Sequence, residues 1–339
     1  MQERLIALQH LAGKIDEKDE WLDAHIHRTY HHNLWFPKEN YWDALEAIKQ
    51  KMLNSDSILE WINHYSFPVA DVHKKRVGIV FAGNIPLVGF HDFLAIYLSG
   101  HETVIKLSSK DPFVFPAIIK IMGEKDPSIH SRVKIVERLE IFDAVIATGS
   151  NNSNRYFEYY FSEVPNILRK NRTSVSILKG DETPEELLSL GKDIFSYYGL
   201  GCRNVTKIFV PSGYGLQDLL DQFSAFDWVI QNSKYKNNFD YNLSIELLNR
   251  SDHFSNNFLV LKRDNSALSS PIGMLYFDDY SNIHDVEGFI QNRKDQIQCV
   301  VGNHKVEDIP LIPFGKSQEP GLFDYPDGVD VGHFLVNIA

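Results

Sequence analysis

Apolar residues recur at spacings of three and four through most of the first 65 positions, as in LIALQHLAGKI and YWDALEAIKQKMLNSDSILEWINHY. This spacing is typical of amphipathic helices, so the N-terminal region is predicted to be helical. Between these segments, WLDAHIHRTYHHNLWFP carries four histidines, which are His25, His27, His31 and His32. Imidazole is a common metal ligand. However, no cysteine or acidic residue completes a recognisable metal-ligand spacing, and the neighbouring aromatic residues favour packing, so no metal is expected.

From Lys75 onward, short apolar runs alternate with helical patterns. Strands are predicted in RVGIVFAGNIP, HETVIKLSS, VKIVERL, FDAVIATGSN and TSVSILKG. The helix PLVGFHDFLAIYLSG closes at Gly100, and Asp111 and Pro112 are expected to start the helix DPFVFPAIIKIMGEKDP. Strands that alternate with helices to about residue 180 predict a parallel, doubly wound sheet. Ligands of such sheets lie beyond the carboxyl ends of the strands, which here carry residues 83–84, 106–109 and 148–151.

A second αβ unit is predicted after Gly180. It begins with the helix TPEELLSLGKDIFSYYGLG and includes the helix YNLSIELLNRS and strands in FLVLK, GMLYF and IQCVV. The segment HFLVNI near the C-terminus is read as a final short strand. We therefore expect two lobes, each built on a mostly parallel doubly wound sheet, with crossings near residues 181 and 315.

Composition narrows the class of protein. The 339 residues include 43% apolar residues, enough for one large core or two modest ones. The net charge of −11 argues against a broad basic face that binds nucleic acid. The N-terminal segment lacks the apolar region of a signal peptide, and no apolar run is long enough to span a bilayer. Two cysteines make no disulfide framework and suit a reducing compartment, so a cytoplasmic protein is expected.

The segment YYGLGCRNVTKIFVP, residues 197–211, places a cysteine between glycines and a β-rich run. Gly199 and Gly201 allow a tight turn that exposes the side chain of Cys202. A thiolate there would be a good nucleophile, and Arg203 and Lys207 are near enough in sequence to lower its pKa. The alternative is that Cys202 is a small buried apolar residue, as most unpaired cysteines are.

Five short motifs follow one another along the chain: GNIP, IKLSS, ATGS, the Gly-Cys turn and PFG near the C-terminus. This order resembles the aldehyde dehydrogenase superfamily. Within it, NIPLVGFHDFLAIYLSG, KNRTSV, YYGLGCRNVTK and PFGKSQEPGLFDYPDGVD look most like the LuxC-type acyl-CoA reductases. The resemblance runs from about residue 70 to the C-terminus. It implies NADPH-dependent reduction of a fatty acyl thioester to an aldehyde, as in bacterial luminescence.

The resemblance also assigns the reacting groups. Cys202 matches the catalytic cysteine that forms a thioester with the acyl group. Asn84 matches the asparagine whose amide shares the oxyanion hole with the backbone N–H of the cysteine. A neutral amide donor is chemically suited to this, because it stabilises a developing oxyanion without trapping it as a salt. The alternative for Asn84 is a plain turn residue ahead of Pro86.

Cofactor contacts follow in the same way. Lys106 matches the lysine that reaches the adenosine ribose or its phosphate, and Ser150, after Gly149, matches the serine beside the pyrophosphate. Ser108 and Ser109 complete the expected cofactor set, since hydroxyls and bare glycine N–H groups at strand ends suit phosphates. The crossings near residues 181 and 315 predict a first domain over residues 1–181, with N-terminal helices and a Rossmann-like cofactor-binding fold, to which residues 316–339 return. Residues 182–315 are the expected catalytic domain.

Three departures from the superfamily pattern refine this interpretation. The strand SVSILKG has Ile177 or Leu178 where aldehyde dehydrogenases carry the glutamate that activates water, which favours a reductase. The segment NSALS before Ser270 lacks the glutamate that holds the nicotinamide ribose. Ser109 stands where NAD enzymes often have a glutamate, and this leaves room for the 2′-phosphate of NADPH.

The sequence and the resemblance together predict an NADPH-dependent reductase of acyl-CoA or acyl-protein thioesters. One alternative is an acyl-transfer protein that keeps the Cys202 acyl-enzyme but lacks hydride transfer, and another is a non-catalytic scaffold subunit of the same fold. The resemblance leaves open an acyl-activating partner enzyme, and a homo-oligomer is expected. His91 is either a proton donor near the Asn84 loop or a core residue, and Cys299 is predicted to belong to the core.

Overall fold

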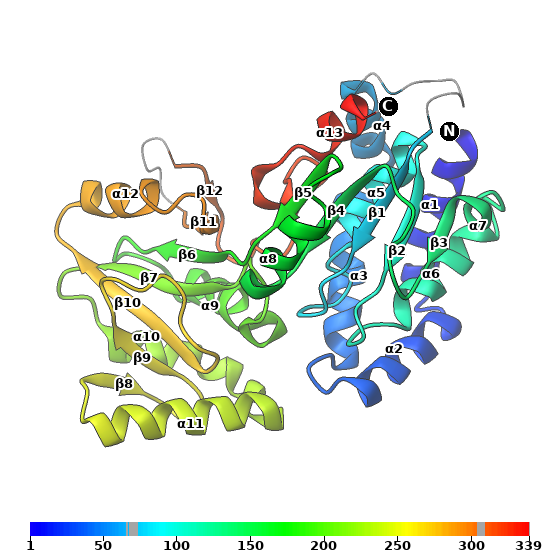
Figure 1. Cartoon of the computed structure of the whole chain (residues 1–339). Coiled ribbons are helices and arrows are strands. Elements are labelled where there is room, and N and C mark those ends of the chain that lie inside the picture. Colours follow the sequence, from blue (N-terminus) through cyan, green and yellow to red (C-terminus); the bar gives the residue numbers. More distant parts are fainter. Residues whose placement is uncertain (66, 68–73, 304–308, 339) are drawn as a thin grey trace. The chain divides into compact units, whose positions relative to one another are not determined.

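The chain folds into two compact units, and the computed structural model describes residues 1–65, 67, 74–303 and 309–338 (Figure 1). Unit 1 comprises Met1–Asn171 and Glu319–Ala339, and unit 2 comprises Arg172–Gln318. The division falls earlier than the crossing expected near residue 181. The reason is that the strand TSVSI, β6 (Thr173–Ile177), pairs with strands of the second sheet rather than the first.

The N-terminal region of unit 1 is helical, as predicted. Its elements are α1 (Gln2–Asp16), α2 (Glu20–His32), α3 (Lys38–Met52) and α4 (Ser55–His64). The side chain of Asp19 caps α2 and that of Asn54 caps α4, each by accepting two backbone N–H groups. The helices α1 and α2 pack against α6 (Val114–Gly123), so this region shares the core of unit 1.

Unit 1 is built on a five-stranded parallel sheet of order β3-β2-β1-β4-β5 (Figure 1). Its strands are β1 (Arg76–Val80), β2 (Glu102–Lys106), β3 (Val133–Ile135), β4 (Ala144–Thr148) and β5 (Asn166–Arg169). The helices α5 (Phe90–Ser99), α6, α7 (Ile129–Arg132) and α8 (Asn151–Tyr160) connect them. Gly100 ends α5 with φ 92°, a conformation that a glycine adopts without strain. The predicted doubly wound architecture of this lobe is confirmed.

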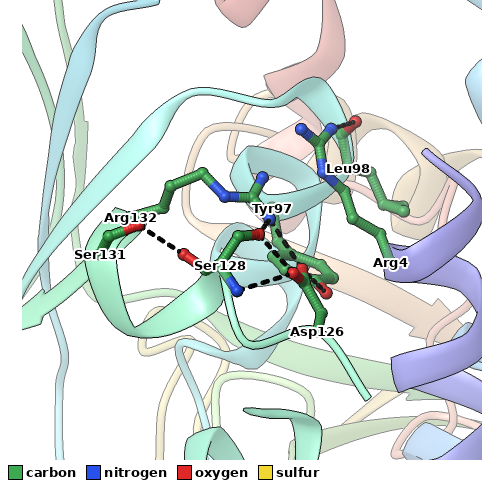
Figure 2. A network of polar contacts seen from close by, with 7 residues as sticks. All are labelled: Arg4, Tyr97, Leu98, Asp126, Ser128, Ser131 and Arg132. Carbon is green, nitrogen blue, oxygen red and sulfur yellow. Dashed lines mark hydrogen bonds and ion pairs between the residues drawn. The ribbon is translucent and has the colours of Figure 1, made fainter.

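A buried polar network fixes α7 to α5, and a second contact ties α1 to α5 (Figure 2). Asp126, with no exposed surface, accepts hydrogen bonds from Tyr97 at 2.8 Å and Arg132 at 2.7 Å, and another from the Ser128 hydroxyl. Arg4 donates to the carbonyl oxygen of Leu98 at 3.1 Å. These bonds hold the carboxylate of Asp126 in place, and despite its burial they keep its pKa below the ordinary value.

Unit 2 is built on a seven-stranded sheet of order β12-β11-β6-β7-β10-β9-β8. All neighbours are parallel except β8 and β9. Besides β6, the strands are β7 (Val205–Pro211), β8 (His253–Ser255), β9 (Val260–Arg263), β10 (Met274–Tyr280), β11 (Ile297–Val301) and β12 (Leu311–Ile312). The mostly parallel second sheet is therefore also as expected.

The helices of unit 2 are α9 (Pro184–Phe195), α10 (Leu216–Gln222), α11 (Ser233–Asn249) and α12 (Ile283–Gln291), with 3₁₀ segments η2 (Ser196–Gly199) and η3 (Phe223–Gln231). A capping box between Thr183 and Glu186 starts α9, and Pro184 occupies its first turn. Apolar residues of β6, β7, β11 and α12 form a core cluster. No helix within the described ranges has both the length and the apolar character needed to cross a bilayer.

The C-terminal segment returns to unit 1 through η4 (Pro326–Gly328) and α13 (Val331–Asn337). The prediction of a final strand at HFLVNI was wrong, because this segment lies in α13. Asp330 caps the helix by accepting the N–H of His333, and Val331 and Leu335, four residues apart, are fully buried. This single apolar face packs on α5.

Candidate functional site

The expected cofactor residues follow three neighbouring strands of the unit 1 sheet. Because β2, β1 and β4 are adjacent and parallel, their carboxyl ends lie at one edge. At this edge the loops after β1 and β2 touch, since a methyl group added to Gly83 would lie 2.2 Å from the Ser108 Oγ. The structure therefore brings the loop of Asn84 next to the loop of Ser108.

The loop after β2 is anchored to the histidine-rich helix α2. The Nε2 atom of His32 lies 2.6 Å from the carbonyl oxygen of Ser109, and the amide of Asn33 donates to the carbonyl oxygen of Lys110 at 3.3 Å. The backbone N–H of Lys110 in turn binds the Ser108 hydroxyl at 3.2 Å. Lys106 is partly buried at the end of β2, and Ser109 is exposed. One histidine of the cluster thus shapes the loop that carries the expected cofactor residues.

Ser150 is the N-cap of α8. Its hydroxyl accepts the backbone N–H of Ser153 at 3.2 Å. Gly149, just before it, is packed so closely that an added methyl group would lie 2.7 Å from the Phe157 ring. A helix N-terminus preceded by a bare glycine presents backbone N–H groups and a positive dipole end, which suits a phosphate. The contact of Gly149 and Ser150 with a cofactor stays a prediction.

The Asn84 loop is held in a strained shape. Leu87 has φ 55°, which is unfavourable for a residue with a branched side chain. Its N–H donates to the carboxylate of Asp111 at 3.4 Å, and the hydroxyl of Tyr41 donates to the same carboxylate. Asp111 was expected to start the next helix, but α6 begins at Val114. Asp111 instead fixes the Asn84 loop, and burial raises the pKa of its carboxyl group.

The turn that carries Cys202 begins with three successive residues in the left-handed region. Tyr197, Tyr198 and Gly199 have φ of 52°, 58° and 77°. Only the glycine adopts this conformation without cost. Both tyrosines are buried, and the ring of Tyr198 contacts Trp228 and Tyr235. Packing of the aromatic rings therefore holds a backbone that the local sequence disfavours.

Asn204 fastens the other side of this turn. Fully buried, it accepts the N–H of Gly201 at 2.8 Å and donates to the carbonyl oxygen of Ser196 at 2.7 Å. It also donates to the carbonyl oxygens of Asp193 and Ile194, both at 3.2 Å. These four contacts brace the turn from both sides. Cys202 itself is partly exposed.

Cys299 lies close to the Cys202 turn. The hydroxyl of Ser174 donates to the carbonyl oxygen of Cys202 and lies 3.0 Å from the Cys299 Sγ. The sheet register shifts between Ser174 and Val175 and again between Ile297 and Val300. Such irregularities often re-aim side chains beside active sites. Burial raises the pKa of Cys299 to about 11, so this thiol stays protonated at neutral pH.

Lys207 and His91, two further candidate residues, make contacts that point to structural roles. Lys207, fully buried, donates to the carbonyl oxygens of Asp264 at 2.6 Å and Ala267 at 3.1 Å, and burial lowers its pKa. It anchors that loop of unit 2. His91 is buried with Nε2 3.0 Å from the carbonyl oxygen of Leu322, which fits the core interpretation better than that of a proton donor.

Two further features of the described residues concern possible metal ligation and a cavity away from the expected cofactor residues. Across the described residues, no group of three or more histidine, cysteine, aspartate or glutamate side chains is arranged to hold a metal ion. A polar cavity of about 360 Å³ is lined by Lys74, Glu102 and Arg132, among others. These residues stand at the amino ends of β1, β2 and β3. The cavity is therefore at the opposite edge of the sheet from the expected cofactor residues.

Asn84 and the cofactor residues belong to unit 1, and Cys202 belongs to unit 2. The pairing of the Asn84 amide with the Cys202 N–H in one oxyanion hole stays a prediction. The sequence did not predict that Ser174 contacts the Cys202 turn or that Asp111 fixes the Asn84 loop. A serine within an apolar strand and an aspartate before a proline carry no pattern that points to a distant loop.

Solved structures that align with this chain include aldehyde dehydrogenases. Aldehyde dehydrogenase 21 from Physcomitrella patens, in complex with succinate, aligns with a TM-score of 0.70 over 99% of this chain and 84% of its own, at 10% identity. An NAD⁺ complex of the Bacillus cereus enzyme aligns with a TM-score of 0.61 over 87% of this chain and 70% of its own, at 14% identity. The chain has the aldehyde dehydrogenase fold.

Among curated proteins, the chain is similar to long-chain acyl-protein thioester reductases, which confirms the predicted resemblance. Identity is 26% to reductase 2 of Photobacterium leiognathi, over 61% of this chain and 47% of that protein. It is 23% to the Photobacterium phosphoreum reductase, over 76% and 59%, and 22% to that of Vibrio harveyi, over 81% and 62%. The matches thus span about half to three fifths of these relatives. No family model matches the chain.

Proposed function

We propose that this chain reduces a fatty acyl thioester to the aldehyde with NADPH, through a covalent acyl-Cys202 intermediate. The observation that carries the proposal is the Cys202 turn. A partly exposed thiol follows a run of left-handed residues, two of them tyrosines, and Asn204 braces the turn. Such strain persists only where the surrounding structure imposes it, and it clusters at active sites. The similarity to acyl-protein thioester reductases gives the reaction class.

In the first step, the Cys202 thiolate attacks the acyl carbonyl carbon. The bond from that carbon to the carrier sulfur then breaks, and the carrier leaves as a thiol after taking up a proton. Thiolates are good leaving groups, so this step needs no strong acid. We assign the developing oxyanion to the amide of Asn84 and the backbone N–H of Cys202.

The residues at the edge of the unit 1 sheet fit a dinucleotide phosphate. An added methyl group would collide with Ser108 at Gly83 and with Phe157 at Gly149, so packing within unit 1 requires glycine at both strand ends. Lys106, Ser108, Ser109 and Ser150 would supply a cation and three hydroxyls to the phosphates. Ser150 lies beside Gly149, whose own N–H donates to the carbonyl oxygen of Arg169 at 3.4 Å. NADPH, when bound, supplies a hydride to the acyl carbon. Serine at position 109 in place of a glutamate favours the 2′-phosphate of NADPH.

Residues near the end of β6 favour reduction over hydrolysis. Ile177 and Leu178 are both fully buried and apolar, where a water-activating carboxylate is expected in aldehyde dehydrogenases. Without such a base, the acyl-enzyme survives until reduction, and the Cys202 sulfur leaves as the aldehyde forms. The acyl donor in our proposal is an acyl-protein or acyl-CoA thioester.

The test is aldehyde formation from a long-chain acyl-CoA, followed by NADPH oxidation and by direct detection of the aldehyde. Wild type is expected to produce aldehyde, and Cys202→Ala none. Asn84→Ala should lose about 100- to 1000-fold in rate, the cost of one oxyanion donor. Aldehyde formation by Cys202→Ala at the wild-type rate would contradict the proposal. If wild type takes up the acyl group but produces no aldehyde with either nicotinamide cofactor, acyl transfer becomes the better account.

A further inference from the structure

The C-terminal end of α9 binds two separate loops of unit 2 through one buried aspartate. The side chain of Asp193 is 1% exposed, and its carboxylate accepts the backbone N–H of Gly315 at 2.6 Å and of Ser317 at 3.0 Å. Each of the two carboxylate oxygens thus accepts one backbone N–H of the same loop. Residues 313–317, here called the PFG loop, are therefore held on α9 by Asp193.

The same turn of α9 holds the Cys202 turn. The backbone carbonyl oxygen of Asp193 accepts the amide of Asn204, whose side chain also binds the N–H of Gly201. The contact from the PFG loop to Cys202 thus runs through few atoms. It passes from the loop N–H groups to the Asp193 carboxylate, then through the helix end to Asn204 and the N–H of Gly201, the residue before Cys202.

The PFG loop has little freedom of its own. Gly315 has φ 78°, and an added methyl group would lie 3.2 Å from the Ser189 Cβ of α9. The N–H of Phe314 donates to the amide oxygen of Asn303 at 3.1 Å, and that amide donates to Glu186 of α9 at 2.6 Å. The loop is therefore fastened to both ends of α9, so a shift of the loop has to be taken up at the helix end.

We propose that Asp193 is a positioning residue for the nucleophile, which couples the PFG loop to the conformation of the Cys202 turn. The inference rests on the proposed function only in taking Cys202 as the nucleophile. Asparagine at position 193 has the same shape but only one acceptor oxygen, so one of the two loop N–H groups would lose its partner. The released loop and the altered helix end would let the strained turn of Tyr197 to Gly199 relax.

The test measures the thiol rather than the reaction. The rate of Cys202 alkylation by iodoacetamide is followed from pH 6 to 10, with peptide mass mapping to separate Cys202 from Cys299. Asp193→Asn should change the rate or shift the pH profile, by about two- to 100-fold as expected within one hydrogen-bond network. Glu185→Gln, an exposed charge on the same helix, should match wild type.

A second variant covers the case in which Asp193→Asn does not fold. Gly315→Ala disturbs the PFG loop without changing Asp193, and it should move the Cys202 profile in the same direction. If either variant lowers Tm but leaves the alkylation profile of Cys202 at that of wild type, Asp193 is only structural and the proposal is wrong. A changed profile in a protein that forms no acyl adduct would refute the proposed function and leave this coupling standing.

Discussion

At the scale of single residues, the loops of Asn84 and Cys202 hold non-glycine residues in the left-handed backbone region. Leu87, Tyr197 and Tyr198 each cost on the order of 1–3 kcal/mol in this conformation. All three are buried, at 4%, 8% and 6% exposure, so packing holds them in place. The sequence indicated a turn at Gly199 and Gly201 but not this strain, because burial rather than local preference decides the backbone of the tyrosines.

Gly83 tests the contact between the loops after β1 and β2. Gly83→Ala would bring a methyl group to 2.2 Å from the Ser108 hydroxyl, so the loops must move apart. Overpacking of this kind costs about 1–3 kcal/mol. We expect a lower Tm and weaker NADPH binding, measured by thermal shift and titration calorimetry.

The matched control for Gly83 is Gly13→Ala in α1. An added methyl group there meets no atom within 4 Å, so this variant should gain about 0.5–1 kcal/mol of stability with unchanged NADPH binding. Wild-type NADPH affinity in Gly83→Ala would mean that the β1–β2 contact is not part of the cofactor site.

At the scale of elements, a buried ion pair joins a helix to an edge strand of the unit 1 sheet. The Arg169 guanidinium on β5 donates to the carboxylate of Asp92 on α5 through both Nη1 and Nη2. The bond from Nη2 is 2.7 Å long. Burial alone would raise the pKa of Asp92, but Arg169 holds it below the ordinary value. The pair therefore stays charged, and the stability of unit 1 depends on the presence of both partners.

Removing one partner of this pair leaves an uncompensated buried charge. We expect Arg169→Met to cost about 3–5 kcal/mol of unfolding free energy. The double variant Arg169→Met with Asp92→Leu should recover most of that loss, because neither charge remains. Denaturant unfolding of the single and double variants measures both. A double variant as unstable as Arg169→Met would show that packing, not the buried charge, determines the loss.

The hydrophobic pattern predicted most elements, including the helical start, four strands of the first sheet and the strand β6. It missed β5, since NILR is too short to stand out between two loops. It misread α13 because a short apolar run fits either a strand or one helical face. Asp330 was the available signal, as an N-cap directly before that run.

At the scale of the whole molecule, unit 1 is completed by the last part of the chain. His101, buried at the start of β2, is a link in this return. Its Nδ1 accepts the N–H of Lys75, and its Nε2 donates to the carbonyl oxygen of Leu335 on α13 at 3.1 Å. The sequence predicted that the chain returns, but not the place where it crosses. The crossing point depends on which sheet β6 pairs with, and a sequence alone does not reveal this pairing.

Protonation of His101 would place its own Nδ1–H against the backbone N–H of Lys75, so that two donors would face each other. Burial lowers the pKa of His101 from its ordinary 6.5, and Lys75 and Arg4 add to this, whereas its backbone bond to Leu335 and Asp143 oppose it. A depressed folded pKa gives a contribution that is present above pH 6.5 and lost as the pH falls through the folded value. Stability should therefore fall on acidification below pH 6.5, by up to about 1.4 kcal/mol per pH unit.

The variant His101→Gln keeps one acceptor and one donor but does not titrate. The difference in stability between wild type and His101→Gln should shrink as the pH falls from 7 to 5, measured by Tm at each pH. A difference that stays constant across this range would exclude His101 as the source of the pH dependence.

The central claim is that Cys202 carries the acyl group, and intact mass measures this directly. Wild type and Cys202→Ala are mixed with a long-chain acyl-CoA, with and without NADPH. We predict an acyl adduct on wild type alone, at Cys202 by peptide mapping, which NADPH discharges as aldehyde. An adduct of equal yield on Cys202→Ala, or none on wild type with any chain length, would contradict the catalytic account and leave the fold unaffected.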